Sequence, residues 1–134
     1  MKRSRIRHTS KRKAPTVRKA NKERAAFAKS FGKCMACGIK DGWNDVPTFP
    51  VFTTLTAHEI ASGPNRFAAI QEPLAQLILC QLCHWELHHN NWSIAKQIAI
   101  RERAIPSEPC RLKVNELRGR APGAITESDI AAEM

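Results

Sequence analysis

Two segments of equal spacing, Cys34-Met35-Ala36-Cys37 and Cys80-Gln81-Leu82-Cys83, decide the fold of this 134-residue chain. Each C-x-x-C turn offers two thiolates, and two such turns supply the four ligands of a tetrahedral zinc ion. The 42 intervening residues form a longer segment than the roughly 15–20 residues of a simple zinc finger. The sequence therefore predicts a structural zinc site that closes a long loop with strands of its own. The alternative, cysteines that are only small buried apolar residues, leaves the repeated spacing unexplained.

The positive charge of the chain is concentrated at one end. Residues 1–33 contain 13 of the 22 Lys and Arg and a single acid, hence +12, whereas residues 34–134 carry −2. A basic arm on a near-neutral body favours a polyanion partner, most simply nucleic acid. The alternative is a solvated or nuclear-localisation-like tail. The arm residues expected to bind a nucleic-acid backbone are Lys2, Arg3, Arg5, Arg7, Lys11, Arg12 and Lys13.

The cysteine count and the hydropathy pattern exclude some classes of protein. Four paired cysteines and one further cysteine, Cys110, suit a reducing compartment better than a disulfide framework. No apolar run follows the basic start, and no stretch of 18 apolar residues occurs, so neither a secretory leader nor a membrane span is expected. We therefore expect a soluble intracellular protein.

Residue patterns also predict the order of the elements. Helices are expected over 15–31, within 66–74, and over 81–90 and 92–104, with a last short helix after Thr126; strands are expected over 51–58 and 76–80, and a loop over 38–50. Ser93 and Thr126 have the character of helix N-caps. The tryptophans Trp43, Trp85 and Trp92 are expected in the core or an interface, because two of them lie in apolar helical patterns.

This order of motifs resembles the HNH endonucleases, a family with a ββα-metal fold that contains paired C-x-x-C zinc sites in many members. The matching residues are Cys34, Cys37, His58, Leu77, Leu79, Cys80, Cys83 and His84. The resemblance covers about residues 34–90. It is closest to a phage-type branch whose first motif reads His-Glu-Ile, then Gly and Arg, here His58, Glu59, Ile60, Gly63 and Arg66.

The resemblance implies an α+β fold: a small ββα-metal (HNH) core held by a four-cysteine zinc site, with flanking helices and a basic N-terminal arm. The implied organisation is an arm and helix over 1–33, a nuclease core over 34–105 and a helical extension over 106–134. It also implies a cytoplasmic location in a bacterium or a phage-infected host cell. The implied partner is DNA.

The resemblance further assigns roles to the histidines. His58 would be the general base that deprotonates the attacking water, and an unperturbed imidazole is largely neutral at pH 7. His84 and His88, one turn apart on a helix, would hold Mg²⁺ or another divalent cation that stabilises the leaving 3′ oxygen. Arg66 would contact a phosphate near His58. His89 is expected to lie on the surface.

Two departures from the family pattern leave a second interpretation open. Ala57 stands where many members have an Asp or His ligand, and the central Asn of the motif falls near Ala75 or Gln76. The alternative function is a non-catalytic, zinc-stabilised nucleic-acid-binding protein, and a less favoured one is a ribosome-associated zinc protein. His58 is then a hydrogen-bonded strand-end residue, and His84 and His88 are zinc ligands or solvated side chains.

Overall fold

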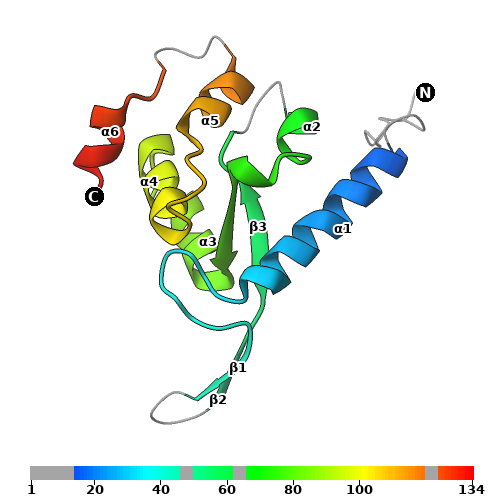
Figure 1. Ribbon diagram of the computed structural model, residues 1–134. Helices are drawn as coiled ribbons and strands as arrows, with labels where there is room; N and C mark the ends of the chain where they lie inside the picture. Colours follow the sequence, from blue (N-terminus) through cyan, green and yellow to red (C-terminus); the bar gives the residue numbers. More distant parts are fainter. Residues whose placement is uncertain (1–13, 46–49, 62–65, 120–123) are drawn as a thin grey trace, which may run out of the picture.

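The structure, a computed structural model, describes residues 14–45, 50–61, 66–119 and 124–134. These residues form a mixed α+β domain with two small antiparallel sheets and six α-helices (Figure 1). The helices are α1 (Ala14–Phe31), α2 (Arg66–Ala69), α3 (Gln81–His89), α4 (Ile94–Ala104), α5 (Arg111–Arg118) and α6 (Glu127–Ala132), with a 3-10 turn η1 (Pro73–Ala75). The strands are β1 (Gly42–Asp45), β2 (Pro50–Thr53), β3 (Leu55–Glu59) and β4 (Gln76–Cys80).

The antiparallel pair β3–β4 forms the centre of the domain. Leu55 lies opposite Cys80, and His58 lies opposite Leu77. All five residues of β4 are buried, as expected for the continuous apolar run Gln76–Cys80. Helix α1 packs on β3, while α3 and α4 pack on β4, so the pair lies between α1 and these two helices (Figure 1). The strand pair continues into α3, which gives a ββα unit.

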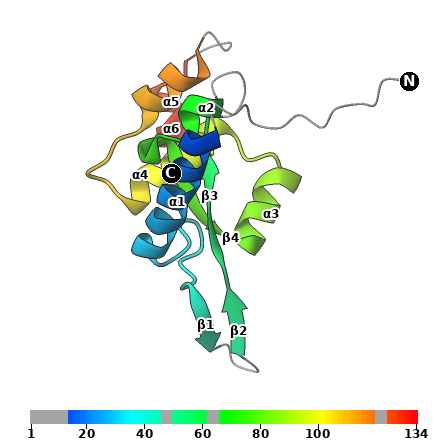
Figure 2. The same ribbon diagram turned by 90° about the vertical axis from the view of Figure 1, so that its right-hand side faces the viewer.

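The segment before this pair differs from the sequence-based expectation. The predicted loop over 38–50 contains strand β1, and the predicted strand over 51–58 is divided at Thr54 into β2 and β3, which belong to different sheets. The β1–β2 hairpin extends away from the rest of the domain (Figure 2). Its cross-strand neighbours Trp43 and Phe52 make an edge-to-face contact at 5.2 Å between ring centroids. Such pairs stabilise antiparallel strands.

Two of the three tryptophans do not occupy the predicted environment. Trp43 is 71% exposed on the hairpin, and Trp85 is 55% exposed on α3. Trp92 packs against the core and has Lys96 Nζ 4.4 Å from its ring centroid. A core position is therefore wrong for Trp43 and Trp85, whereas a position in an interface stays a prediction. Trp85 lies on the outward face of α3, which an apolar pattern in a short helix does not reveal, and Trp43 lies on a hairpin that the sequence did not predict.

The helix boundaries agree closely with the predicted ones. Helix α1 ends at Gly32, which adopts a φ of 79°, a left-handed conformation that glycine accepts without strain. Ser93 caps α4 by accepting a hydrogen bond from the Lys96 amide at 3.0 Å. Thr126 and Asp129 form a reciprocal capping box on α6. No helix within the described residues is long and apolar enough to cross a bilayer.

Arg101 of α4 is fully buried and joins three elements of the domain. Its Nε donates to the Gln76 carbonyl at 2.8 Å, and its Nη2 donates to the Pro73 carbonyl at 3.3 Å and to the Glu108 carboxylate at 2.9 Å. Its guanidinium also lies 5.4 Å from the ring centroid of Phe27. The side chain therefore satisfies carbonyls at the start of β4 and fixes α4 against α1.

Arg101→Ala is expected to lower the free energy of unfolding by about 2–4 kcal/mol, because buried carbonyls lose their donor and a cavity forms. The measurement is urea unfolding followed by circular dichroism. Arg103→Ala is the matched control, since Arg103 is an exposed arginine on the same helix; its effect should stay within about 0.5 kcal/mol. Equal effects of the two substitutions on the free energy of unfolding would contradict the structural role assigned to Arg101.

Candidate metal centres

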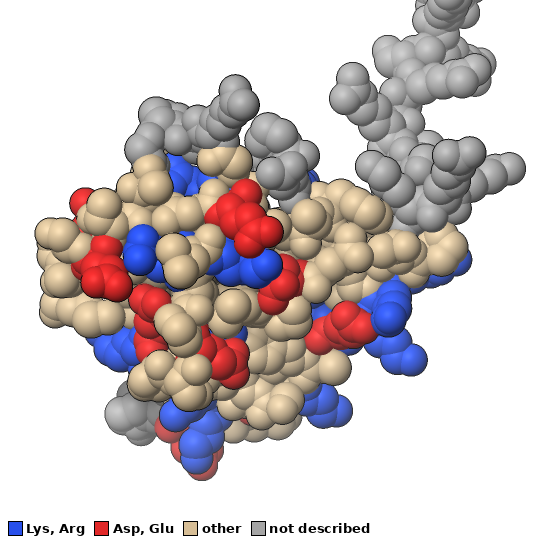
Figure 3. Space-filling view, turned by 45° about the horizontal axis from the view of Figure 1, so that its top comes forward, with Lys and Arg blue, Asp and Glu red and all other residues tan. Residues whose placement is uncertain are grey.

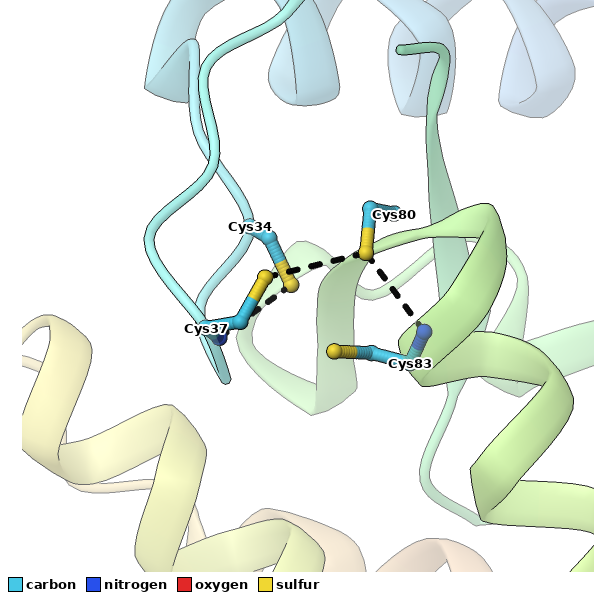
Figure 4. Close-up of side chains that lie close together, drawn as sticks. All are labelled: Cys34, Cys37, Cys80 and Cys83. Carbon is cyan, nitrogen blue, oxygen red and sulfur yellow. Dashed lines mark hydrogen bonds between the residues drawn. The ribbon is translucent and has the colours of Figure 1, made fainter. Parts of the chain in front are cut away.

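The two C-x-x-C turns meet at one end of the β3–β4 pair (Figure 4). The ligand atoms of Cys34, Cys37, Cys80 and Cys83 lie within 4.8 Å of one another. The Sγ atoms of Cys37 and Cys80 are 3.7 Å apart. Two sulfurs bound to one tetrahedral zinc ion at about 2.3 Å lie about 3.8 Å apart. The four side chains therefore fit a zinc ion, as the repeated spacing predicted.

Hydrogen bonds from backbone amides hold the first turn against β4, the strand that leads into the second turn. The Met35 amide donates to the Ile78 carbonyl of β4 at 2.8 Å, and the Ile78 amide donates to the Met35 sulfur at 3.3 Å. Within each turn, the amide of the second cysteine approaches the sulfur of the first: Cys37 to Cys34 at 3.5 Å, and Cys83 to Cys80 at 3.4 Å. The two turns therefore share one local geometry.

The surroundings of the cluster shift the pKa of its thiols in different directions. Burial raises the pKa of the Cys37 and Cys83 thiols. At Cys34 burial acts in the same direction, but backbone N–H groups, that of Cys37 first, outweigh it and lower the pKa. The thiolate, not the thiol, is the zinc ligand, so binding of zinc would displace the protons of these thiols. The fifth cysteine, Cys110, lies outside the cluster, and burial raises its pKa to about 12.

A second cluster of ligand atoms lies where β3 passes α3. His58 comes from β3, and His84 and His88 come from successive turns of α3; their ligand atoms also lie within 4.8 Å of one another. The Nε2 atoms of His84 and His88 are 3.1 Å apart. Two imidazole nitrogens that share one ion at about 2.1 Å lie roughly 3.0–3.4 Å apart. The cluster therefore fits a single cation, and its imidazole donors suit a transition metal better than Mg²⁺.

The surroundings of His58 keep its ring neutral. Burial, then the neighbouring His84, lowers the pKa of His58 to about 4. Burial and His88 also lower the pKa of His84. A neutral imidazole can accept a proton or bind a metal ion, whereas the imidazolium can do neither.

His89 lies on the exposed side of α3, as expected, with its ring stacked on Trp85 at 3.8 Å between ring centroids.

The three histidines open into a pocket of about 560 Å³, whose walls also carry charged side chains. The pocket is lined by Arg24, Ala57, His58, Glu59, Arg66, His84 and His88. Arg24 of α1 donates to the Ala57 carbonyl at 2.7 Å and pairs with Glu59 at 3.2 Å. One oxygen of Glu59 and the Nε of Arg24 are buried without a hydrogen-bond partner. The pocket therefore offers both positive and negative groups beside the histidines.

Some of the site residues predicted from the sequence lie together in the structure, and others lie outside the described residues. It gathers the four cysteines into one cluster and His58, His84 and His88 into another, and it brings Arg66 to the same pocket as the histidines. The arm residues Lys2, Arg3, Arg5, Arg7, Lys11, Arg12 and Lys13, and also Gly63, lie outside the described residues. The role of His58 as a base stays a prediction, since the triad geometry equally suits a metal ligand.

Two residues at this site were missed in the sequence. Arg24 belongs to the predicted basic helix, and no pattern along the chain indicates that it reaches β3. Gln97 of α4 places its Oε1 3.2 Å from His58 Nε2. It shares a helix face with Ile94, Ile98 and Arg101, and a polar residue on an apolar stripe was a signal that it has a buried partner. Gln76, considered for the Asn position, instead donates to the Ile70 carbonyl at 3.0 Å.

Comparisons of the chain with protein-family models, with curated proteins and with solved structures find no match.

Proposed function

We propose that the chain is a metal-dependent DNA endonuclease of the HNH type, which hydrolyses phosphodiester bonds. The observation that carries this proposal is the convergence of His58, His84 and His88, in a pocket that also contains Arg24 and Arg66. Three imidazoles beside two guanidinium groups can hold a cation and attract a phosphate. The ββα order of the elements that supply the histidines agrees with the family resemblance.

In this proposal each residue of the pocket has a separate role in hydrolysis. His84 and His88 would hold a divalent cation, which would supply Lewis-acid stabilisation of charge on the phosphate and the leaving oxygen. His58, neutral at pH 7, takes the proton of the attacking water. Arg66 is exposed at the pocket wall and contacts a phosphate oxygen. Arg24 orients the end of β3 through the Ala57 carbonyl and Glu59.

The distribution of charge supports DNA as the substrate. On the face shown in Figure 3, basic and acidic side chains of the body are interspersed. Residues 1–33, by contrast, carry +12. The arm therefore supplies the affinity for the backbone and the pocket supplies the chemistry. Phosphate contacts of this kind position a protein on DNA without reading its sequence.

Deleting residues 1–13 is expected to weaken DNA binding and to flatten its salt dependence. Each neutralised phosphate contributes about −0.9 to the log–log slope, so removal of seven basic residues makes the slope less negative by up to about 6. The measurement is fluorescence anisotropy with a labelled duplex over a range of salt concentrations. A full-length variant with these seven residues changed to Gln should match the deletion. An unchanged slope would assign the arm another role.

The test of the proposed function is incubation with supercoiled plasmid in the presence of Mg²⁺, Mn²⁺, Ni²⁺ or Zn²⁺. We expect nicked or linear products with at least one of these ions and none in the presence of chelator. A chain that binds the plasmid but is inert with all four ions would instead be the non-catalytic zinc-stabilised nucleic-acid-binding protein.

A further inference from the structure

The buried amide of Gln97 makes two hydrogen bonds that together determine how His58 is protonated. We propose that Gln97 is a positioning residue, which holds His58 in the Nε2-protonated form and leaves Nδ1 as its reacting nitrogen. Gln97 belongs to α4, outside the ββα unit, and is 4% exposed. The inference deepens the proposed function and rests on it for its catalytic meaning, but the protonation state can be measured without activity.

The first step concerns the orientation of the amide. Gln97 Nε2 lies 2.9 Å from the carbonyl oxygen of Trp92. A backbone carbonyl only accepts, so the group that faces it must be the NH2. The flipped amide would place two oxygens against each other at this distance. Trp92 immediately precedes Ser93, the N-cap of α4, and its own amide donates to the Leu87 carbonyl at 3.1 Å. The amide therefore has one orientation, with Oε1 toward His58.

The second step concerns the ring of His58. Its Nε2 lies 3.2 Å from Gln97 Oε1, and an amide oxygen only accepts. The hydrogen between the two atoms must therefore belong to His58 Nε2. A neutral imidazole carries one ring proton, so Nδ1 keeps the lone pair. The Trp92 carbonyl sets the orientation of the Gln97 amide, and the amide oxygen accepts from His58 Nε2. The position of one backbone carbonyl thus determines which nitrogen of His58 carries the proton.

The two residues near which the Asn of the family motif falls do not supply this contact to His58. Ala75 has no polar side-chain atom to offer the ring, and the Gln76 amide donates to the Ile70 carbonyl instead. Whether His58 removes a proton from water or binds the cation, it needs a lone pair on a defined nitrogen. Gln97 determines which nitrogen of His58 keeps the lone pair. It does so from α4, a helix that contributes none of the residues lining the pocket.

The experiment is nitrogen-15 NMR of the full chain labelled in histidine, compared with Gln97→Met and Gln97→Glu. We expect His58 of the wild type to show a proton on Nε2 and a lone pair on Nδ1. Gln97→Met removes the acceptor and should give a mixture of the two forms. Gln97→Glu retains an acceptor toward His58 and should keep the Nε2-protonated form, with its second oxygen protonated toward the Trp92 carbonyl. His84 and His88 serve as internal controls, because their Nε2 atoms face each other while Gln97 faces His58.

Activity provides a second readout. Loss of a partner that orients a catalytic or ligating histidine costs about 10–100-fold in activity or metal affinity, so Gln97→Met should nick plasmid that much more slowly at unchanged DNA affinity. A wild-type His58 protonated on Nδ1 would overturn the inference, even if Gln97→Met failed to fold. So would a Gln97→Met variant that keeps the pure Nε2-protonated form. If the wild type cleaves no DNA, the proposed function fails while the NMR result still decides the inference.

Discussion

His58→Ala is expected to lower the rate of plasmid nicking by about 10²–10⁴-fold, the range for loss of a positioned general base. The histidine is the member of the triad that β3 supplies, and it faces the pair on α3 with ring centroids 5.2 and 5.5 Å away. Among the described residues, His84 and His88 are the other histidines that line this pocket. The measurement is conversion of supercoiled to relaxed plasmid under the most effective cation.

The matched control is His89→Ala, because His89 lies on the same helix as His84 and His88 but stacks on Trp85 instead of joining the triad. Its nicking rate should stay within about twofold of the wild type if its role is only a surface one. Both variants should retain one equivalent of zinc at the four cysteines and a cooperative thermal transition. Wild-type nicking by His58→Ala, with the fold intact, would refute the assignment of the site.

A cation titration of His58→Ala and His84→Ala distinguishes two roles of His58, general base and metal ligand. If His58 acts only as the base, His58→Ala requires the same concentration of cation for half-maximal activity and has a lower maximal rate. If it is a ligand, the required concentration rises, by about tenfold or more for a lost or misplaced ligand. His84→Ala should raise it in either case, since His84 Nε2 lies 3.1 Å from His88 Nε2.

Cys80→Ser is expected to unfold the domain completely, and not only to lower its free energy of unfolding. Cys80 supplies one of the four sulfurs, ends β4 and caps α3 by accepting from the Cys83 amide. Structural zinc sites contribute about 10–16 kcal/mol of binding free energy to folding. That is as large as the whole stability of a typical domain, about 5–15 kcal/mol. The expected result is loss of bound zinc and of the cooperative thermal transition, measured by elemental analysis and circular dichroism.

Cys110→Ala is the matched control for this prediction. Cys110 is also fully buried, but it lies outside the cluster and packs among the apolar residues of the core. The substitution should cost about 1 kcal/mol, typical of a small core truncation, and should leave the zinc content unchanged. A Cys80→Ser protein with one equivalent of zinc and a wild-type melting temperature would show that the four sulfurs do not hold the domain together.

Local signals predicted most of the regular structure. Helix α1, strand β4 and the caps Ser93 and Thr126 were located within one or two residues, because each depends on neighbours in the chain. The cysteine cluster was predicted for a similar reason: a C-x-x-C turn carries its metal geometry within four residues. The histidine pair on α3 follows from helical spacing alone.

The remainder depends on contacts between segments that are distant in the sequence. The β1–β2 hairpin was missed because Gly42, Asn44 and Asp45 are typical turn residues, and its pairing is supported by the aromatic contact across the strands. The partners of His58 and Glu59, namely Gln97 and Arg24, come from α4 and α1. Only the packing of these helices on the strand pair brings them into contact with His58 and Glu59.

Cys83 and His84 are consecutive residues at the start of α3, so the two metal centres are neighbours along one helical turn. They differ in accessibility, since Cys83 is buried whereas His88 is exposed. When metal ions become scarce, we expect an ion at the imidazoles to dissociate before one at the sulfurs, so that the proposed hydrolysis would stop while the domain stays folded. Added metal would then restore the proposed activity without refolding of the domain.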